Sequence, residues 1–232
     1  MLSDPALISD AHRETRLRVL ELLDGADRAI GETTVPACPA WTVRMVISHL
    51  AGADEDILAG RLEGVASDAW TGAQVERHLD DDLGSLLAIW AELGPQIDGL
   101  LPVIPAIAAS QLVFDVFAHE QDVRGALDQP GGRESTAVTV ALGFLLSSLR
   151  DGIEAKGLPS LLIAFTDREP VVLGESEARI SLEASGWELL RALGGRRSVG
   201  QIRAMAWSAD PEPYLALYGE GPVRPPSTDL VE

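Results

Sequence analysis

The hydrophobic pattern of the first half of the chain predicts four helices. Apolar residues recur there at helical spacing in segments that turns separate from one another. We expect helices at about residues 5–30, 42–61, 72–94 and 106–127. Thr42 suits the N-cap of the second helix, and Pro95 is expected to end or kink the third. Helices of similar length joined by short turns are typical of an up-down, antiparallel bundle.

The pattern changes at residues 129–133, where Pro and Gly interrupt the helical period. Beyond this point we expect an apolar helix at 136–155, short strands at 158–165, 170–174 and 178–184, and helices at 185–195 and 198–207. A mixture of this kind indicates a small α+β domain. The predicted fold is therefore mainly α: a four-helix bundle at 1–130, an α+β domain at 134–218, and a disordered tail at 219–232.

Charge narrows the classes of function. Eighteen Lys and Arg face 36 Asp and Glu, for a net charge of −18. A nucleic-acid binder needs a basic surface to neutralise phosphates, and anionic membranes repel an acidic protein, so we expect neither partner. The longest uncharged stretch, 99–114, is too short to span a bilayer. No basic leader followed by an apolar block opens the chain, and we expect a cytoplasmic protein.

Candidate chemistry lies mainly in the fourth predicted helix. Asp115 and His119 are four residues apart, so they project from one face of the helix. The residues around Asp115 are apolar, and a carboxylate in such surroundings needs a partner. A divalent metal would be one, since imidazole and carboxylate together suit zinc or another first-row ion. His49, in the middle of the second predicted helix, is the natural third ligand.

A plainer interpretation of the same residues stays open. Asp115 and His119 would then be an ordinary side-chain pair on a solvated face, and His49 a hydrogen-bonded core histidine. We expect His12 and His78, which lie among charged residues, to be at the surface.

The remaining candidates have weaker signals. Cys38, the only cysteine, excludes an internal disulfide. It would be a nucleophile if a base lay near it, but a single cysteine in a Pro-rich loop is more typical of a small buried apolar residue. Trp41 would either line a pocket or pack its loop onto the second helix. Asp80, Asp81 and Asp82 are expected on a solvated face. Arg196 and Arg197 would hold an anionic group or else cap the end of a helix.

Three segments together resemble a known family. They are CPAWTVRMVISHLAG at 38–52, FDVFAHEQDVRGAL at 114–127 and ISLEASGWELLRALGGRRS at 180–198. The first is similar to a Pro-Trp-Thr loop before a helix that ends in His-Leu. The second is similar to an acidic residue with His four positions later, and the third to a strand and helix ending in Gly-Arg. In this order they resemble the mycothiol-dependent maleylpyruvate isomerase family, whose first domain is a DinB-like metal-binding bundle.

The resemblance implies a divalent metal, usually zinc, held by His49, Asp115 and His119. These are the residues that helical spacing also selects. The family commonly has Glu where this chain has Asp115, so the ion is expected to sit differently or to bind more weakly here. Both side chains remain competent ligands, since both are carboxylates.

The resemblance also implies a reaction. A thiol bound to zinc becomes a thiolate, which in the isomerase adds to a conjugated double bond, allows rotation and then leaves. In other members the thiol is transferred permanently to an electrophile. The reacting sulfur would belong to the cosubstrate mycothiol and not to Cys38. Asp122 and Arg124 would support the ligands, and Arg196 and Arg197 would bind a carboxylate of the substrate.

Two classes of function remain. One is an enzyme that uses a metal and a small-molecule thiol on an electrophilic substrate, as an isomerase or a thiol S-transferase. The other is a non-enzymatic metal-binding or stress-response protein of the same fold, because one fold hosts several functions. An open ligand position beside the metal would favour the enzyme.

Overall fold

The computed structural model describes residues 2–219 and 223–232. Contacts divide the chain into two compact units, Asp4–Ala137 and Val138–Glu232. The division lies a few residues beyond the predicted boundary at 129–133. The first unit contains the helices α1 (Pro5–Leu22), α2 (Arg28–Gly31), α3 (Val43–Leu58), α4 (Asp68–Arg77), α5 (Leu83–Leu100) and α6 (Ala106–Ala126), with a 3-10 turn at Leu101–Val103.

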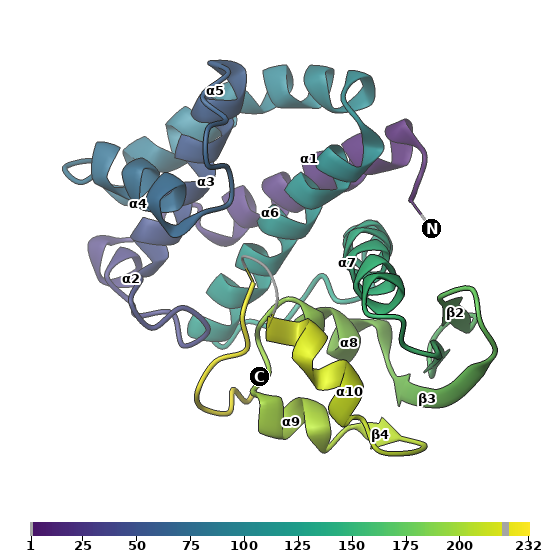
Figure 1. Ribbon diagram of the computed structural model, residues 1–232. Coiled ribbons are helices and arrows are strands. Elements are labelled where there is room, and N and C mark those ends of the chain that lie inside the picture. Colours follow the sequence, from purple (N-terminus) through teal and green to yellow (C-terminus); the bar gives the residue numbers. More distant parts are fainter. Residues whose placement is uncertain (1, 220–222) are drawn as a thin grey trace. The chain divides into compact units, whose positions relative to one another are not determined.

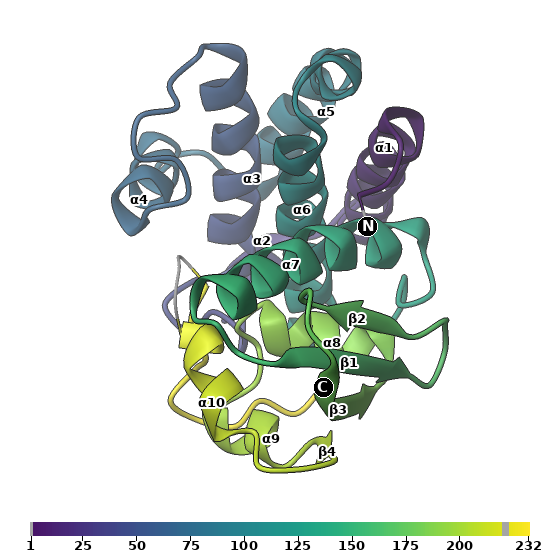
Figure 2. The same ribbon diagram turned by 45° about the vertical axis from the view of Figure 1, so that its right-hand side comes forward.

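Four long helices of the first unit, α1, α3, α5 and α6, form the predicted bundle (Figures 1 and 2). Helix α1 packs on α5 and α6, and α3 packs on the same two helices. Helices α1 and α3 therefore lie diagonally across the bundle, as do α5 and α6, whereas the consecutive helices α3 and α5 are neighbours. Thr42 caps α3 as predicted, accepting a hydrogen bond from the backbone N–H of Met45.

The third predicted helix is two helices. Helix α4 ends at Arg77, and α5 starts after Asp82, whose side chain accepts a hydrogen bond from the N–H of Ser85. Leu79, inside the predicted helix, lies in the turn between α4 and α5 and is exposed. Helix α5 also continues through Pro95, which was expected to end or kink it. Residues on both sides of the proline are buried in the core, and their packing offsets the one lost hydrogen bond.

The second unit is the predicted α+β domain. Its sheet has the strand order β2-β1-β3-β4, with β1 and β3 parallel and the outer pairs antiparallel. The elements are α7 (Thr136–Ala155), β1 (Ser160–Phe165), β2 (Val171–Leu173), β3 (Ala178–Ala184), α8 (Gly186–Leu193), α9 (Val199–Arg203), β4 (Ala206–Trp207), α10 (Glu212–Leu215) and a 3-10 turn (Ala216–Gly219). The helix expected at 198–207 ends at Arg203, and its last residues form β4 instead.

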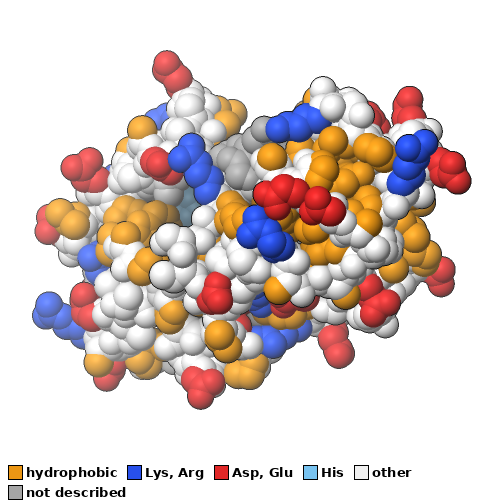
Figure 3. Space-filling view, turned by 60° about the horizontal axis from the view of Figure 1, so that its bottom comes forward, with side chains coloured by type: hydrophobic (Ala, Val, Ile, Leu, Met, Phe, Trp, Pro, Cys, Tyr) orange, Lys and Arg blue, Asp and Glu red, His pale blue; other side chains and the backbone are white. Residues whose placement is uncertain are grey.

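Helix α7 is long and apolar enough to cross a membrane by composition alone. However, 61% of its most apolar window is buried inside the protein. This is the burial of a core helix in a globular domain, which explains the hydrophobicity without a membrane. Acidic side chains are scattered over the face shown in Figure 3, both at its edges and near its centre.

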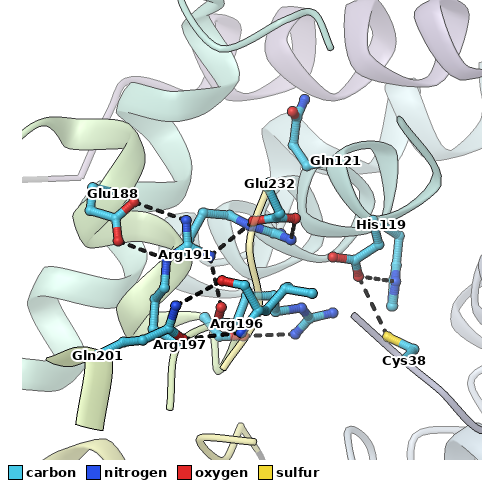
Figure 4. A network of polar contacts seen from close by, with 12 residues as sticks. Cys38, His119, Gln121, Glu188, Arg191, Arg196, Arg197, Gln201 and Glu232 are labelled. Atoms are coloured by element: carbon cyan, nitrogen blue, oxygen red, sulfur yellow. Dashed lines mark hydrogen bonds and ion pairs between the residues drawn. The ribbon is translucent and has the colours of Figure 1, made fainter. Parts of the chain in front are cut away.

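The end of the chain differs from the predicted disordered tail. The Glu232 side chain forms ion pairs with Arg191 and, at 2.9 Å, with Arg197 (Figure 4). The backbone carbonyl of Leu230 accepts a hydrogen bond from Gln201 at 2.8 Å. Buried guanidinium groups need carboxylate partners, and the tail supplies one. Residues 220–222 of the predicted tail lie outside the described residues.

Replacing Glu232 by Gln should destabilise the second unit by about 3 kcal/mol, because Arg191 is fully buried and loses a charged partner. Urea unfolding measures the loss. Glu169→Gln, at an exposed carboxylate in the same unit, is the control. Equal stability of the two variants would show that the tail contact contributes nothing.

The bundle core contains a cluster of charged side chains. Both terminal nitrogens of the Arg16 guanidinium group donate to the carboxylate of Asp98, at 3.0 and 2.7 Å. His12 is fully buried, with Nδ1 3.7 Å from Asp98, and His78 is also buried, with Nδ1 2.8 Å from Asp81. The prediction that both histidines lie at the surface is therefore wrong. Carboxylates make this burial possible. Asp98 comes from a segment distant from His12, whereas Asp81 is only three residues from His78, and Glu55 of α3 is 3.3 Å from Nε2 of the same ring.

Asp54 of α3 is buried in the same core, and burial raises its pKa to about 6, although His12 and Arg16 favour the charged form. The folded protein thus holds this proton more tightly than the unfolded chain does. The free energy of unfolding should therefore fall as the pH rises from about 4 to about 6. Above that range the buried carboxyl is ionised, and the full destabilisation is present.

Replacing Asp54 by Asn removes this cost. In metal-free protein, the free energy of unfolding of Asp54→Asn should rise relative to wild type by up to about 3 kcal/mol as the pH goes from about 4 to about 7. Urea unfolding across that range measures it, with exposed Asp24→Asn as the control. A difference that does not depend on pH would contradict the assigned pKa.

Candidate metal centre

The structure brings His49, Asp115 and His119 together. His49 comes from α3 and the other two from successive turns of α6. Nε2 of His49 is 3.2 Å from Asp115 Oδ2, and Nε2 of His119 is 3.8 Å from Asp115 Oδ1. One ligand atom from each residue lies within 4.8 Å of the others. Ligands around a tetrahedral zinc ion, with bonds of about 2.0–2.1 Å, are about 3.3–3.5 Å apart, so this donor set fits such an ion.

A hydrogen-bond chain fixes the orientation of His49. Its Nδ1 is 2.7 Å from the side-chain oxygen of Gln74, and the amide nitrogen of Gln74 donates to Asp56 at 2.9 Å. Asp56 in turn pairs with Arg61 and Arg77, at 2.7 and 2.6 Å. Since the carboxylate can only accept, the oxygen of Gln74 must face His49 and accept the Nδ1 proton. The lone pair of Nε2 is then directed toward Asp115, as metal ligation requires.

Gly52 makes this chain possible. It lies on α3 opposite Gln74, and a Cβ at position 52 would be 2.6 Å from Cβ of Gln74. No real side chain tolerates that distance, so any larger residue would push α4 and its glutamine away from α3. Gly52, which has no side chain, therefore determines how closely the amide of Gln74 approaches His49.

Trp41 and Asp122 surround the second histidine. The indole of Trp41 stacks on the ring of His119 with a centroid distance of 5.9 Å, and lies 5.4 Å from the ring of His49. Trp41 also packs against the bundle core, which is the packing role expected for it. Nδ1 of His119 is 3.1 Å from Asp122 Oδ2, and the supporting role of Asp122 remains a prediction.

The site combines buried and accessible ligands. His49 is buried, whereas one third of the Asp115 side chain is exposed. Burial lowers the pKa of His49, but the Asp115 carboxylate and the hydrogen bonds outweigh it, so the pKa is raised. The carboxylate of Asp115 thus favours positive charge at the point where an ion would bind. Solvent reaches the group through Asp115.

Arg124 lies one turn beyond Asp122 but is directed elsewhere. Its Nε donates to Glu120 at 3.0 Å, and Glu120 also accepts from Arg18 of α1. A terminal nitrogen of Arg124 donates to the backbone carbonyl of Gln129. Arg124 thus fastens the end of α6, and its predicted supporting role toward the ligands remains a prediction.

Arg196 and Arg197 belong to the second unit. Arg196 donates to the carbonyl of Gly194 at 2.7 Å, which is the helix-capping contact expected as the plainer alternative. Arg197 pairs with Glu188 and Glu232. Both guanidinium groups thus have partners within their own unit. Binding of a substrate carboxylate by these residues remains a prediction.

Sequence reasoning missed Gln74 and Asp56. Gln74 lies on α4, a short amphipathic helix that the periodicity merged with α5, so its approach to α3 was not foreseen. Gly52 was a usable signal, because a glycine inside a helix commonly marks a close approach of another segment.

Two solved structures share the fold. One is a mycothiol-dependent maleylpyruvate isomerase with a histidine-to-alanine substitution, with a TM-score of 0.55 and 12% identity over 82% of this chain and 88% of that chain. The other is a mycothiol-dependent maleylpyruvate isomerase, with a TM-score of 0.51 and 14% identity over 83% and 88%. No protein-family model and no curated protein matches the sequence. The bundle followed by a small α+β unit is thus the fold of these isomerases.

Gly52→Ala should weaken zinc binding by about 10–100-fold, the usual effect of losing a hydrogen-bond partner of a metal ligand. Gly72→Ala, on the open side of α4 where a new Cβ meets nothing within 4 Å, is the matched control. Competition with a chelating dye measures the zinc dissociation constant of each variant. Equal affinities would mean that the Gln74 chain does not support the site.

Proposed function

We propose that this protein is a divalent-metal-dependent enzyme that uses a low-molecular-weight thiol, such as mycothiol, as its nucleophile. The type of reaction would be that of a maleylpyruvate isomerase or a thiol S-transferase. The observation that carries the proposal is the convergence of two imidazole nitrogens and one carboxylate on a partly exposed point of the bundle. The fold shared with mycothiol-dependent isomerases supports the choice of thiol.

His49, Asp115 and His119 would hold the ion, with zinc the first choice for this donor set. An ion held there would supply positive charge that favours the thiolate form of a bound thiol at neutral pH. Three protein ligands leave a fourth position in a tetrahedral site, and the exposure of Asp115 places that position within reach of solvent.

The residues around the ligands have separate tasks in this proposal. Gln74 holds His49 with Nε2 directed to the centre, and the Trp41 ring covers both imidazoles on one side. Cys38 lies beside Asp122, at the Nδ1 side of His119, and not among the three converging donors. This placement favours an external thiol as the reacting sulfur. We also propose a cytoplasmic location, where such thiols stay reduced.

The test is an assay of the zinc-loaded protein with maleylpyruvate and with electrophiles, each with and without added mycothiol. An isomerase forms product without consuming thiol, whereas an S-transferase consumes it and forms an adduct that mass spectrometry detects. His49→Ala and His119→Ala should each lower metal content and reduce activity by more than about 100-fold, since a ligand matters at least as much as its supporting residues.

His78→Gln is the matched control, because this histidine lies in the same unit but is not one of the three candidate ligands. Turnover that needs no added thiol would contradict the proposal. A protein that retains its metal but turns over none of these substrates with thiol present would instead support a non-enzymatic metal-binding function.

A further inference from the structure

A second group of metal-ligating side chains lies beside the first. Sγ of Cys38 is 3.6 Å from Asp122 Oδ2, and Nδ1 of His119 is 3.1 Å from the same oxygen (Figure 4). One ligand atom of each residue lies within 4.8 Å of the others. The two groups share His119 but use opposite ring nitrogens, with Nε2 toward Asp115 and Nδ1 toward Asp122.

The ring of His119 lacks a hydrogen-bond partner on the side of the second group. His119 is more than nine-tenths buried, yet Nδ1 has no hydrogen-bond partner among the described residues. The contact with Asp122 is close, but it does not have hydrogen-bond geometry. A buried ring nitrogen without a partner is destabilising, and an ion placed between these residues would satisfy it.

The loop that carries Cys38 is held in place. The N–H of Cys38 donates to the carbonyl of Val35, the N–H of Trp41 donates to the carbonyl of Cys38, and the N–H of Val35 donates to the carbonyl of Trp41. Val35 is fully buried in the core, and two prolines restrict the same turn. The position of the thiol is thus determined by closed backbone contacts and core packing.

The donor set selects a class of ion. Thiolate, imidazole and carboxylate together suit zinc and similar thiophilic divalent ions, whereas magnesium and calcium prefer oxygen ligands. With bonds of about 2.0–2.3 Å, tetrahedral ligands are about 3.3–3.5 Å apart, and the two contacts of Asp122 lie on either side of this range. Binding releases the thiol proton of Cys38 to solvent, and the charges of Cys38 and Asp122 then balance the divalent ion.

We infer that Cys38, Asp122 and Nδ1 of His119 form a second metal site for a thiophilic divalent ion, back to back with the first. The inference goes beyond the proposed enzymatic function, which needs only the first site. When both sites are filled, the His119 ring has lost both of its N–H protons and bridges the two ions. Asp122 then serves as a ligand.

Cobalt titration of the metal-free, reduced protein tests the inference. Cobalt bound to a thiolate gives a charge-transfer absorption in the near ultraviolet. Cys38 is the only cysteine, so this absorption reports one side chain. We expect about two cobalt ions per chain together with the absorption. Cys38→Ser, which keeps the size of the side chain, should abolish the absorption and bind about one ion fewer.

His49→Ala provides the opposite control. It removes a ligand of the first site only, so it should keep the thiolate absorption while binding about one ion fewer. Unchanged stoichiometry in His49→Ala would contradict the first site and leave the second standing. Wild-type protein without the absorption, or a second ion that Cys38→Ser retains, would overturn the second site.

A chemical measurement on the wild-type chain avoids any dependence on folding of the variants. Alkylation of Cys38 by iodoacetamide should slow at least about tenfold when cobalt is bound, because a coordinated thiolate is a poor nucleophile toward the reagent. His49→Ala should show the same protection. An alkylation rate that cobalt does not change would count against ligation by Cys38.

Discussion

The geometry of the candidate centre depends on one hydrogen bond, from Nδ1 of His49 to the side chain of Gln74. A histidine buried in an apolar core can keep either of its tautomers, and only a fixed acceptor on one nitrogen directs the other toward a ligand. Gln74 is such an acceptor because Asp56, itself held by two arginines, determines the orientation of its amide. An electrostatic network that begins near the surface thus orients a ring in the core.

The bundle of the first unit buries several charged side chains. Besides the candidate centre, it encloses the pair of Arg16 and Asp98, the buried Asp54, and Glu120 with two arginines. Each group costs desolvation that only precise partners offset. Such a core tolerates less rearrangement than an apolar one, and this rigidity suits a site whose ligands come from different helices.

The sequence predicted what depends on local spacing. Asp115 and His119 face one way because they are four residues apart on a helix, and His49 was chosen as a mid-helix residue of a neighbouring helix. The three donors meet, as expected. The two-part fold was predicted from the change of period near residue 130, and it is confirmed.

What the sequence did not predict depends on contacts between distant segments. The supporting role of Gln74 requires α4 to be a separate helix, which the N-cap at Asp82 brings about. Burial of His12 depends on Asp98, many residues away, and order in the tail depends on Arg191, whose burial is a property of the folded unit. In each case a polar or charged side chain pairs with a residue from a distant segment, and hydrophobic periodicity does not predict such pairs.

The close packing at Gly52 has a consequence for how this site changes during evolution. A single methyl group there would separate the amide from His49 without altering a ligand, so the chemistry could be lost while every ligand is retained. Glycine at position 52 and glutamine at position 74 should therefore be kept or lost together among descendants of this sequence. A descendant that retains the two histidines and the carboxylate but not this pair would keep the ligands without the support that orients His49.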